Sequence, residues 1–560
     1  MSADDPYAPL PPPIWEKYPR AVPAVAVGIA TALLTLFMFP PFHAPELAYV
    51  FAAPAMFWAY RKPSLRIYVW TLFAAQSVAW IGILIWLRHV SWVGLLLLGP
   101  LVGVWVGVWY LAVWWAMPRM RGQPHGIRLA AQLGLAGLWV VLEWTRTWFI
   151  TGFPWLPLAA SQWQRTVVLQ IAAYTGAGGV SFVLIAVNIG FAAYAHRLFF
   201  EKGAGFKRRS QEFMLGVFLL LGCLCLFFRD GPNRRFVAPL ARVAFIQPDI
   251  PQSVKWEPGE ADSVVRTLYG LTLLAGQVQP DFMLWPESAL PVELNLNAPG
   301  QDRQIVDYID RQAKSPLLFG AEAEKDDRWY DAAFVATPEG GVQPGYYAKR
   351  HLVPFGEYVP WHWLFGWVKK VVPIGDDATP GPEVQEPLAV PLRNSTAVLE
   401  AGPLICYEDV FPSLARESVR MGAQALVVLT NDAWYGEEGA AYQHAAHSVL
   451  RAVETRRPVL RDGNAGWSGW IDEFGSFSTG EEDEGQSGRS TILADKGSVY
   501  FRGERTISIL HDIRWAGRQT FYVRHGDWFV LVCVALAVFG YWIVRTPAPA
   551  PLRKKEPLEI

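Results

Sequence analysis

Cysteine is scarce in this sequence, which has four among its 560 residues: Cys223, Cys225, Cys406 and Cys533. Their spacing fits neither a zinc site nor a disulfide framework. Three of them lie inside apolar runs, so Cys406 is the single cysteine of a polar region. A surplus of positive charge is also missing, because the net charge is −1. We therefore expect no nucleic acid partner.

Charged residues are few as well, at 18% of the chain, whereas 52% of the residues are hydrophobic and 14% aromatic. This balance excludes an ordinary soluble protein. Long apolar runs account for it, with approximate limits 21–39, 46–60, 67–87, 92–117, 127–148, 178–199, 211–228 and 528–544. We expect each run to span a membrane as a helix, although the second is short for a span. The first is expected to be a retained span and not a signal peptide.

The basic residues of the connecting loops predict how these spans are oriented. If the N-terminus is cytoplasmic, the outside short loops hold little Lys or Arg beyond Arg88 and Arg165, and the inside loops hold the rest. The positive-inside rule requires this asymmetry. The predicted domains are a cytoplasmic tail (1–20), a seven-span domain (21–228), a domain outside the cytoplasm (229–527), a last span (528–544) and a cytoplasmic tail (545–560).

Beyond residue 242 the chain changes character, because short β-branched runs alternate with polar helical stretches. The expected strands are 243–247, 282–285, 317–320, 331–336, 342–346, 396–405, 425–430 and 459–462, and the expected helices lie near 260–277 and 302–313. This alternation predicts an α/β domain. The expected fold class is thus a polytopic α-helical membrane bundle of about eight spans, joined to an α/β domain.

Cys406 directly follows one of the expected strands, and a helix is expected to begin near Pro412. A turn between a strand and a helix can hold a nucleophile at the C-terminal edge of the strand, beside the N–H groups of the helix. A cysteine after an apolar strand is, however, more often a small core residue. Other segments have to decide between the two interpretations.

Two further segments supply partners for an attacking thiol. Glu287 ends the apolar strand 282–285, and Lys349 and Glu357 lie in a loop that proline and glycine punctuate. A carboxylate that takes the thiol proton, a thiol that attacks and an ammonium that binds the oxyanion form a complete set for acyl transfer. The sequence therefore favours a catalytic cysteine.

Four motifs are similar to those of a known family: W-P-E-S at 285–288, K-R-H-L-V-P-F-G-E-Y-V-P at 349–360, C-Y-E at 406–408 and T-N-D-A-W-Y-G at 430–436. In them the chain resembles the apolipoprotein N-acyltransferases, bacterial membrane enzymes of the nitrilase superfamily of carbon–nitrogen hydrolases. The resemblance implies an αββα sandwich over about residues 242–510 and a triad of Glu287, Lys349 and Cys406. It also implies supporting or substrate-binding roles for Glu357, Glu408, Tyr407, Trp256 and Trp434.

The resemblance implies a function as well. Glu287 would be the base, Cys406 the nucleophile and Lys349 the ligand of the oxyanion. A phospholipid would give an acyl chain to Cys406 as a thioester, and the acceptor would be the N-terminal amine of a diacylglyceryl-cysteine lipoprotein. The implied location is the bacterial inner membrane, with residues 229–527 in the periplasm. We expect a monomer without a cofactor.

Two other functions stay open at this point. A membrane-tethered amidase or nitrilase would use the same triad, with water as the second nucleophile. A transporter or receptor could have kept the fold for binding, but polar residues are nearly absent from the centres of the expected spans. Segment 361–372 holds three tryptophans, a phenylalanine and two lysines, which favours a lipid substrate. The alternative for this segment is a buried hairpin of the sandwich.

Three more features have no settled role. His444 and His447 could face one way on an expected helix, but no carboxylate stands at metalloprotease spacing, so we expect no metal. Glu143 and Arg146, one helical turn apart, would either pair at the membrane surface or, as the resemblance of their segment implies, lie beside the catalytic domain. Gly103 begins a Gly-x-x-x-Gly spacing that permits close helix packing.

Overall fold

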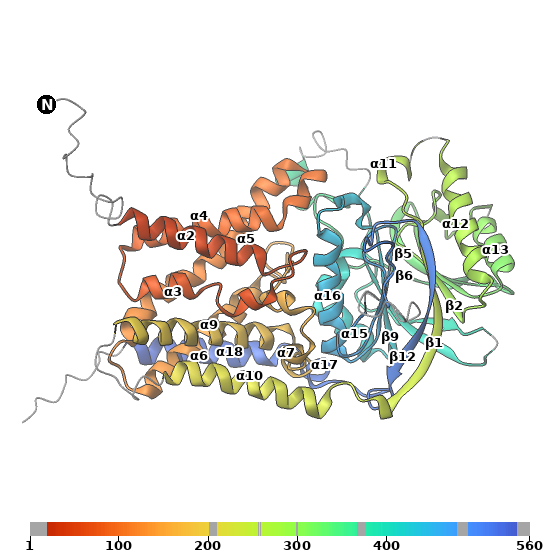
Figure 1. Ribbon diagram of the computed structural model, residues 1–560. Coiled ribbons are helices and arrows are strands. Elements are labelled where there is room, and N and C mark those ends of the chain that lie inside the picture. The colour runs from red at the N-terminus through yellow and green to blue at the C-terminus, as the bar shows by residue number, and fades with distance from the viewer. Residues whose placement is uncertain are drawn as a thin grey trace, which may run out of the picture.

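The computed structural model describes residues 20–200, 210–255, 257, 259–297, 301–366, 377–393, 395–478 and 491–545. A bundle of long helices lies beside an α/β sandwich (Figure 1). Both ends of the chain contribute to the bundle, because the last helix returns to it from the sandwich. The fold class expected from the sequence is confirmed.

The main helices of the bundle are α2 (Ala21–Phe37), α3 (Ala53–Ala59), α4 (Leu65–Ile83), α5 (Trp92–Ala116), α6 (His125–Thr145), α9 (Ala177–Phe200), α10 (Gln211–Asp230) and α18 (Trp528–Val544). Among the described residues, four helical segments are long and apolar enough to cross a membrane: Trp92–Met120, His125–Thr145, Ala177–Phe200 and Gln211–Phe236. Helices α2 and α18 are apolar but shorter.

The second expected span does not form one long helix. Residues 46–60 instead form a 3-10 turn (Pro45–Tyr49) and the seven-residue helix α3. A helix of that length extends about 10 Å, whereas the hydrocarbon core of a bilayer is about 30 Å thick. The count of eight spans therefore stays a prediction.

Close packing in the bundle depends on glycine. A Cβ atom at Gly103 of α5 would lie 2.6 Å from the Cα atom of Ser77 on α4. A Cβ atom at Gly137 of α6 would lie 2.6 Å from the carbonyl oxygen of Cys533 on α18. Neither distance leaves room for a side chain, so these helices approach each other at backbone contact. The helix contact expected at Gly103 is present.

The sandwich has two sheets, one with the strand order β12-β1-β2-β4-β5-β6 and with β3 beside β4, the other with the order β11-β10-β9-β8-β7. The strands are β1 (Val237–Gln247), β2 (Phe282–Trp285), β3 (Leu294–Asn295), β4 (Leu317–Lys325), β5 (Arg328–Thr337), β6 (Gly341–Ala348), β7 (Leu388–Pro391), β8 (Val398–Ile405), β9 (Ala425–Thr430), β10 (Val459–Gly463), β11 (Gly469–Ile471) and β12 (Gly503–Asp512). Every expected strand is present, and β3, β7, β11 and β12 are additional. Strands β1, β2 and β4 run parallel, as do β8, β9 and β10.

Helices cover the outer face of each sheet, as expected for an αββα sandwich. Helices α12 (Ala261–Gly276) and α13 (Gln301–Ala313) pack on the first sheet. Helices α15 (Pro412–Arg420) and α16 (Ala440–Thr455) pack on the second. A separate core between the two sheets contains Phe245, Leu284 and Val427.

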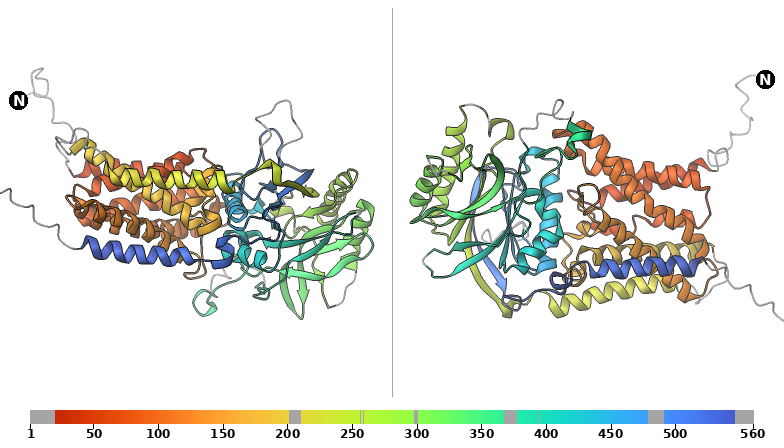
Figure 2. Two further views of the ribbon diagram at one scale, coloured as in Figure 1. Left: turned by 90° about the horizontal axis from the view of Figure 1, so that it is seen from below. Right: turned by 180° about the vertical axis from the view of Figure 1, so that it is seen from behind.

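Helix α16 lies between the second sheet and the bundle (Figures 1 and 2). Its Gln443 side chain binds four groups of the bundle. The amide oxygen accepts hydrogen bonds from the indole N–H groups of Trp86 and Trp155, both at 2.9 Å. The amide nitrogen donates to the carbonyl oxygens of Pro40 at 3.1 Å and Ile83 at 2.9 Å. This one side chain therefore joins three separate segments of the bundle to the sandwich.

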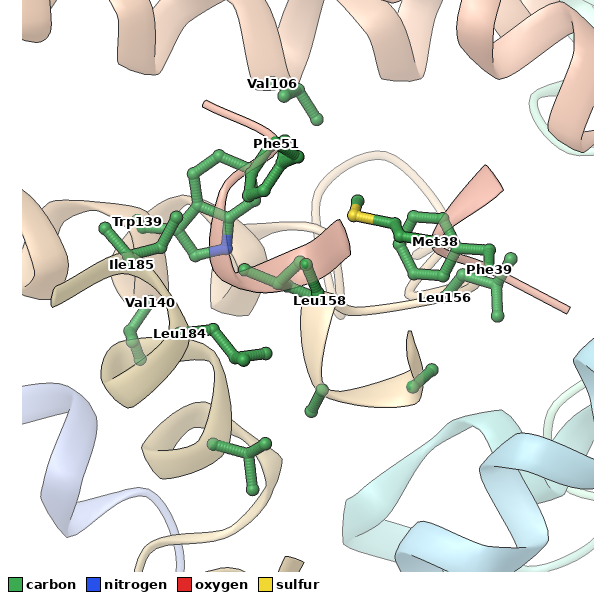
Figure 3. Packing of buried hydrophobic residues seen from close by; sticks show 14 of the residues in the cluster. Met38, Phe39, Phe51, Val106, Trp139, Val140, Leu156, Leu158, Leu184 and Ile185 are labelled. Carbon is green, nitrogen blue, oxygen red and sulfur yellow. The ribbon is translucent and has the colours of Figure 1, made fainter. Parts of the chain in front are cut away.

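The hydrophobic core is continuous across this junction. Buried residues of the bundle, of α16 and of the second sheet belong to one cluster. Figure 3 shows part of it, with Met38 and Phe39 after α2, and Leu156 and Leu158 in the loop that follows α6. The loop after α6 therefore brings residues of the bundle to α16, the helix on the bundle side of the sandwich.

Candidate active site

Cys406 lies at the C-terminal end of β8, where the chain enters the 3-10 turn Cys406–Val410 and then α15. Its backbone has a φ of +49°, in the left-handed region that a residue with a side chain rarely adopts. Its side chain is buried, with 6% of the residue exposed. Strained residues of this kind cluster at functional sites, so the geometry agrees with a catalytic interpretation of Cys406.

Glu287 follows β2, and the first sheet comes unusually close to it. A Cβ atom at Gly320 of β4 would lie 2.7 Å from the Cα atom of Glu287, so this position of β4 accommodates glycine alone. Ser288, the next residue, has a φ of +45°. Interaction with the thiol of Cys406 contributes to the lowered pKa of Glu287, and the charge of Glu287 raises the pKa of that thiol. The expected base and the expected nucleophile are therefore electrostatically coupled.

Lys349 directly follows β6, and three carboxylates enclose its Nζ atom. This atom lies 2.9 Å from Oε1 of Glu287, 2.5 Å from Oε1 of Glu357 and 3.3 Å from Oδ2 of Asp331. The lysine side chain has no exposed surface. The structure thus brings the three expected catalytic residues together. It also places Glu357, for which the resemblance implies a supporting or substrate-binding role, on the lysine.

Asp331 is the member of this cluster that the sequence does not predict. It lies in β5, directly opposite Glu322 of β4, and only 4% of it is exposed. Its backbone carbonyl also accepts a hydrogen bond from the N–H of Lys349 at 2.8 Å. The sequence does contain a signal for Asp331, which is an acidic residue at the start of an apolar strand. A buried carboxylate in that place needs a charged or hydrogen-bonding partner.

The charges of the cluster follow from burial and from mutual interaction. Burial alone would lower the pKa of Lys349, but the surrounding carboxylates raise it well above its ordinary value. Burial alone would raise the pKa of Glu287, but the ammonium of Lys349 and hydrogen bonds from Asp331 and Lys349 keep it lowered. Burial and the charges of Glu287 and Glu357 raise the pKa of Asp331 well above its ordinary value. At neutral pH the cluster therefore holds a charged lysine and a charged Glu287, whereas burial favours the protonated form of Asp331.

Burial and the charge of Glu287 raise the pKa of the Cys406 thiol well above its ordinary value, and Lys349 opposes this shift only in part. The thiol is therefore protonated at neutral pH and has to lose its proton during attack. Glu287 is the carboxylate whose charge acts most strongly on this thiol. The arrangement suits attack assisted by a general base, and it does not suit a preformed thiolate.

Glu408 and Tyr407 connect the turn of the nucleophile to its surroundings. The buried carboxylate of Glu408 accepts hydrogen bonds from the backbone N–H groups of Arg350 at 2.7 Å and Ile405 at 2.8 Å. It thereby joins the lysine loop to the end of β8. The hydroxyl of Tyr407 donates to the carbonyl oxygen of Gly152, in the loop after α6, at 3.2 Å. Both side chains thus bind backbone groups of neighbouring segments.

A cavity of about 730 Å³ opens onto Glu287 and Glu357. Trp434, which is 48% exposed, also lines it, in agreement with the substrate contact that the family resemblance implies. Among the described lining residues the basic side chains are Lys255 and Arg328, and acidic side chains outnumber them. Trp256, the other expected aromatic residue, lies outside the described residues.

Glu143 and Arg146, at the end of α6, hold the loop that follows them. Oε1 of Glu143 accepts a hydrogen bond from the N–H of Leu158 at 2.6 Å. Nη2 of Arg146 donates to the carbonyl oxygen of Trp155 at 2.5 Å. Because Trp155 in turn donates to Gln443 of α16, the two ionisable residues lie beside the sandwich, which is the second of the two expected arrangements.

His444 and His447 are both buried on α16 but have separate partners. The ring of His444 lies between Asp409 and Asp432, with a nitrogen 2.9 Å from a carboxylate oxygen of each. Nε2 of His447 accepts a hydrogen bond from the N–H of Leu156, in the loop after α6, at 3.1 Å. One histidine therefore faces the turn of the nucleophile, and the other faces the bundle.

The described part of segment 361–372 includes an exposed helix, α14 (His362–Phe365). Trp363 is 83% exposed and Trp361 43%, and the ring of Phe365 packs 5.5 Å from that of Phe355. Figure 2 shows this short green helix at the level where the sandwich meets the bundle. The alternative of a buried hairpin is wrong for residues 361–366, and residues 367–372 lie outside the described residues.

Comparison with known proteins gives matches over both parts of the chain. The family described as "Apolipoprotein N-acyltransferase N-terminal domain" matches residues 31–190, and "Carbon-nitrogen hydrolase" matches residues 242–506. A relative from Geobacter metallireducens, named apolipoprotein N-acyltransferase, is 33% identical over 541 residues, which are 93% of this chain and 95% of the relative. A relative of the same name from Brucella melitensis is 33% identical over 364 residues, 62% of this chain and 64% of its own. The crystal structure of an amidase from Nesterenkonia sp. is 17% identical and covers 49% of this chain and 92% of its own, with a TM-score of 0.35.

Proposed function

This chain belongs to the apolipoprotein N-acyltransferase family, and from that premise we propose how its residues carry out acyl transfer. It is an acyltransferase with a carbon–nitrogen hydrolase domain. The proposed donor is a membrane phospholipid, and the proposed acceptor is the N-terminal amine of a diacylglyceryl-cysteine lipoprotein. The observation that carries the catalytic proposal is the cluster in which Lys349 binds Glu287 and the charges of both residues act on the thiol of Cys406.

The first half of the reaction loads the enzyme. Glu287 takes the proton of Cys406 while Sγ attacks the carbonyl carbon of the phospholipid ester, and the carbonyl oxygen becomes an oxyanion. When the oxyanion collapses, the bond between the carbonyl carbon and the glycerol oxygen breaks, and Glu287 returns its proton to that oxygen. Lysophospholipid leaves, and the acyl chain stays on Cys406 as a thioester.

The oxyanion is held by the ammonium of Lys349 and by the backbone N–H of Tyr407. An ammonium has three hydrogens, and in this structure three carboxyl groups take them. The contact with Asp331 is the longest, at 3.3 Å, and burial favours the neutral form of that partner by raising its pKa. The Asp331 contact is therefore the weakest of the three and the one that the oxyanion replaces.

The second half of the reaction unloads the enzyme. The amine of the acceptor attacks the thioester carbonyl carbon, and Glu287 takes a proton from the attacking nitrogen. A carbon–nitrogen bond forms, the carbon–sulfur bond breaks, and the sulfur of Cys406 regains a proton from Glu287. The product is an amide-linked third acyl chain, and the triad returns to its starting state.

The exposed aromatic residues of α14 suit an enzyme that takes its donor from a bilayer. A soluble amidase gains little from tryptophan at the rim of its active site, because exposed apolar area promotes association. Tryptophan is stable at the boundary between head groups and acyl chains. The position of α14 where the sandwich meets the bundle supports this role.

The role of α14 is testable with two substrates. Replacing Trp363 and Phe365 by serine should slow thioester formation from vesicle phospholipid and leave reaction with a short water-soluble ester unchanged. A matched control replaces Leu274, in α12, and Val278, just after that helix, by serine, since both are exposed apolar residues. Equal loss with both substrates would contradict the role of α14 in lipid entry.

The membrane placement is proposed from the distribution of basic loop residues. We place the domain of residues 229–527 in the periplasm of a bacterial cell and the bundle of residues 21–228, with 528–544, in the inner membrane. Tails 1–20 and 545–560 then lie in the cytoplasm. In this orientation the catalytic cluster lies on the periplasmic side of the membrane, where the N-termini of exported lipoproteins lie.

A membrane-tethered amidase is the alternative that uses the same triad. Mass spectrometry of lipoprotein N-termini separates the two, in cells that depend on this chain for the last acylation. Expression of the chain should convert diacylated N-termini to triacylated ones, and the Cys406→Ala variant should not. N-termini that stay diacylated in the presence of the folded wild-type chain would contradict the proposed function.

A further inference from the structure

A buried ionic cluster lies directly behind the turn of the nucleophile. Asp409 comes from that turn, Asp432 from the 3-10 turn Asp432–Tyr435, His444 from α16 and Arg461 from β10. All four side chains are buried, and the reaction described above uses none of them. Charged groups taken out of water are costly to keep unless each has a partner, so their presence here needs a reason.

The four side chains form a closed set of contacts in which each carboxylate meets two cationic groups. Nδ1 of His444 lies 2.9 Å from Oδ1 of Asp432, and Nε2 lies 2.9 Å from Oδ1 of Asp409. Arg461 reaches the other oxygen of each carboxylate, with Nη1 3.2 Å from Asp409 and Nη2 2.9 Å from Asp432. The geometry therefore requires a proton on both nitrogens of His444.

Burial and the charge of Arg461 would lower the pKa of His444, but Asp409 and Asp432 raise it to about 9. His447, one turn further along α16, has its pKa lowered well below the ordinary value by burial. Two buried histidines of one helix thus carry different charges at neutral pH. The charged one is the one that faces the nucleophile.

His444 has one further contact, and it is with the nucleophile itself. Nε2 lies 3.1 Å from the backbone carbonyl oxygen of Cys406. That oxygen belongs to the same peptide group as the N–H of Tyr407, which is the proposed backbone donor to the oxyanion. Because a peptide group is planar and trans, a bond that fixes the direction of its carbonyl also fixes the direction of its N–H. A charged donor on the carbonyl also polarises the group and strengthens the N–H as a donor.

We propose that His444 is a positioning residue that acts through the peptide between Cys406 and Tyr407, and that it aims and strengthens the backbone N–H that binds the oxyanion. The proposal rests on the acyl-transfer mechanism given above and adds a residue to it. Asp409, Asp432 and Arg461 hold the imidazolium in place. The left-handed backbone of Cys406, which is unfavourable by itself, is held by the same contact.

The test separates two reactions of one thiol in the full-length chain in detergent. Alkylation of Cys406 by iodoacetamide displaces iodide and creates no oxyanion. Acylation of Cys406 by a short water-soluble ester passes through one. Both rates are read by mass spectrometry of the peptide that contains Cys406. In the His444→Gln variant, acylation should fall by about 10- to 100-fold, mostly in kcat, and alkylation should change by less than about threefold.

The matched control is His447→Gln, an equally buried histidine on the same helix that contacts the bundle and not Cys406. Its ratio of acylation to alkylation should equal that of the wild type, even if the variant is less stable. A second variant, Asp432→Asn, keeps the shape of the cluster and weakens the charge on His444. It should lower the same ratio, and it keeps the proposal testable if His444→Gln does not fold.

Three results would overturn the inference. Alkylation and acylation falling together in the folded His444→Gln variant would mean that the cluster only holds the fold. An unchanged ratio would mean that the contact with the Cys406 carbonyl has no part in acyl transfer. An equal fall of the ratio in His447→Gln would remove the distinction between the two histidines. Failure of the wild-type chain to become acylated at Cys406 is a different result, because it contradicts the proposed function itself.

Discussion

Replacing Lys349 by methionine removes the cation that three buried carboxyl groups surround and keeps most of the side-chain volume. The variant can no longer form the ion pairs with Glu287 and Glu357 or the contact with Asp331. Removing one partner of a buried ion pair costs about 3–5 kcal/mol, because the other charge stays behind without compensation. For a domain of this size each kcal/mol lowers the Tm by about 2–4 °C, so the expected decrease is about 6–20 °C. Acyl transfer should be abolished at the same time.

The pH dependence of the Tm distinguishes the loss of the lysine charge from a loss of packing. In the wild type, Lys349 keeps the pKa of Glu287 lowered, so the stability from this pair is present above the ordinary value of 4.5 and is lost as the pH falls below it. In the variant, burial acts on Glu287 without the lysine and raises its pKa. The folded variant then binds a proton that the unfolded chain does not, so its stability rises as the pH falls from neutral toward the ordinary value of 4.5. The difference in Tm between wild type and variant should therefore narrow over this range.

Scanning fluorimetry of the full chain in detergent measures both effects. Lys325→Met is the control, because Lys325 is an exposed lysine at the end of β4, in the same sheet. It should leave the Tm within about 2 °C of the wild type, as for most surface substitutions. A Lys349→Met variant as stable as this control, or a difference in Tm that does not change with pH, would refute the reasoning.

Three further predictions concern single residues and the other cysteines. Glu287→Gln should slow thioester formation by about 10²–10⁴-fold, because the general base is lost while the shape of the side chain is kept. Rapid-quench measurement of acylation gives this rate, and a rate near that of the wild type would mean that another group is the base. Replacing the three cysteines other than Cys406 by serine should leave most of the transferase activity in vesicles, because none of them lies near the cluster, and a loss of acylation in the folded variant would contradict this. The raised pKa of His444 contributes stability that is complete below about 6.5 and is lost as the pH rises through about 9. This contribution to stability is about 3 kcal/mol. The difference in Tm between wild type and His444→Gln should therefore shrink from pH 7 to pH 9.5. A difference that stays constant would argue against a charged His444.

The strands, and the places of Glu287 and Cys406 at strand ends, could be predicted from the sequence because both signals are local. An apolar run that ends in a polar motif predicts a strand and the residue at its end, and the C-terminal ends of parallel strands meet at one edge of a sheet. Glu287 and Cys406 both lie at such ends. Lys349 follows an antiparallel strand, and the family motif around it supplied its role.

Partners that depend on register could not be predicted in the same way. Asp331 comes next to Lys349 because β5 and β6 pair in one register, and a shift by one residue would turn its side chain to the other face. His444 comes behind Cys406 because α16 packs on the second sheet, across about forty residues of sequence. Strand β12 pairs with β1 over a still longer separation. The second expected span is not one continuous helix, because the structure breaks it after Tyr49 into a turn and a short helix.

The central claim is that Cys406 carries the acyl chain. Intact-mass spectrometry of the isolated full-length chain after incubation with phospholipid vesicles, without an acceptor, tests it most directly. We predict a mass increase of one acyl chain that maps to Cys406, disappears on treatment with neutral hydroxylamine and is absent from Cys406→Ala. An acyl chain on a serine or on another cysteine, or transfer to an acceptor by the Cys406→Ala variant, would contradict the account.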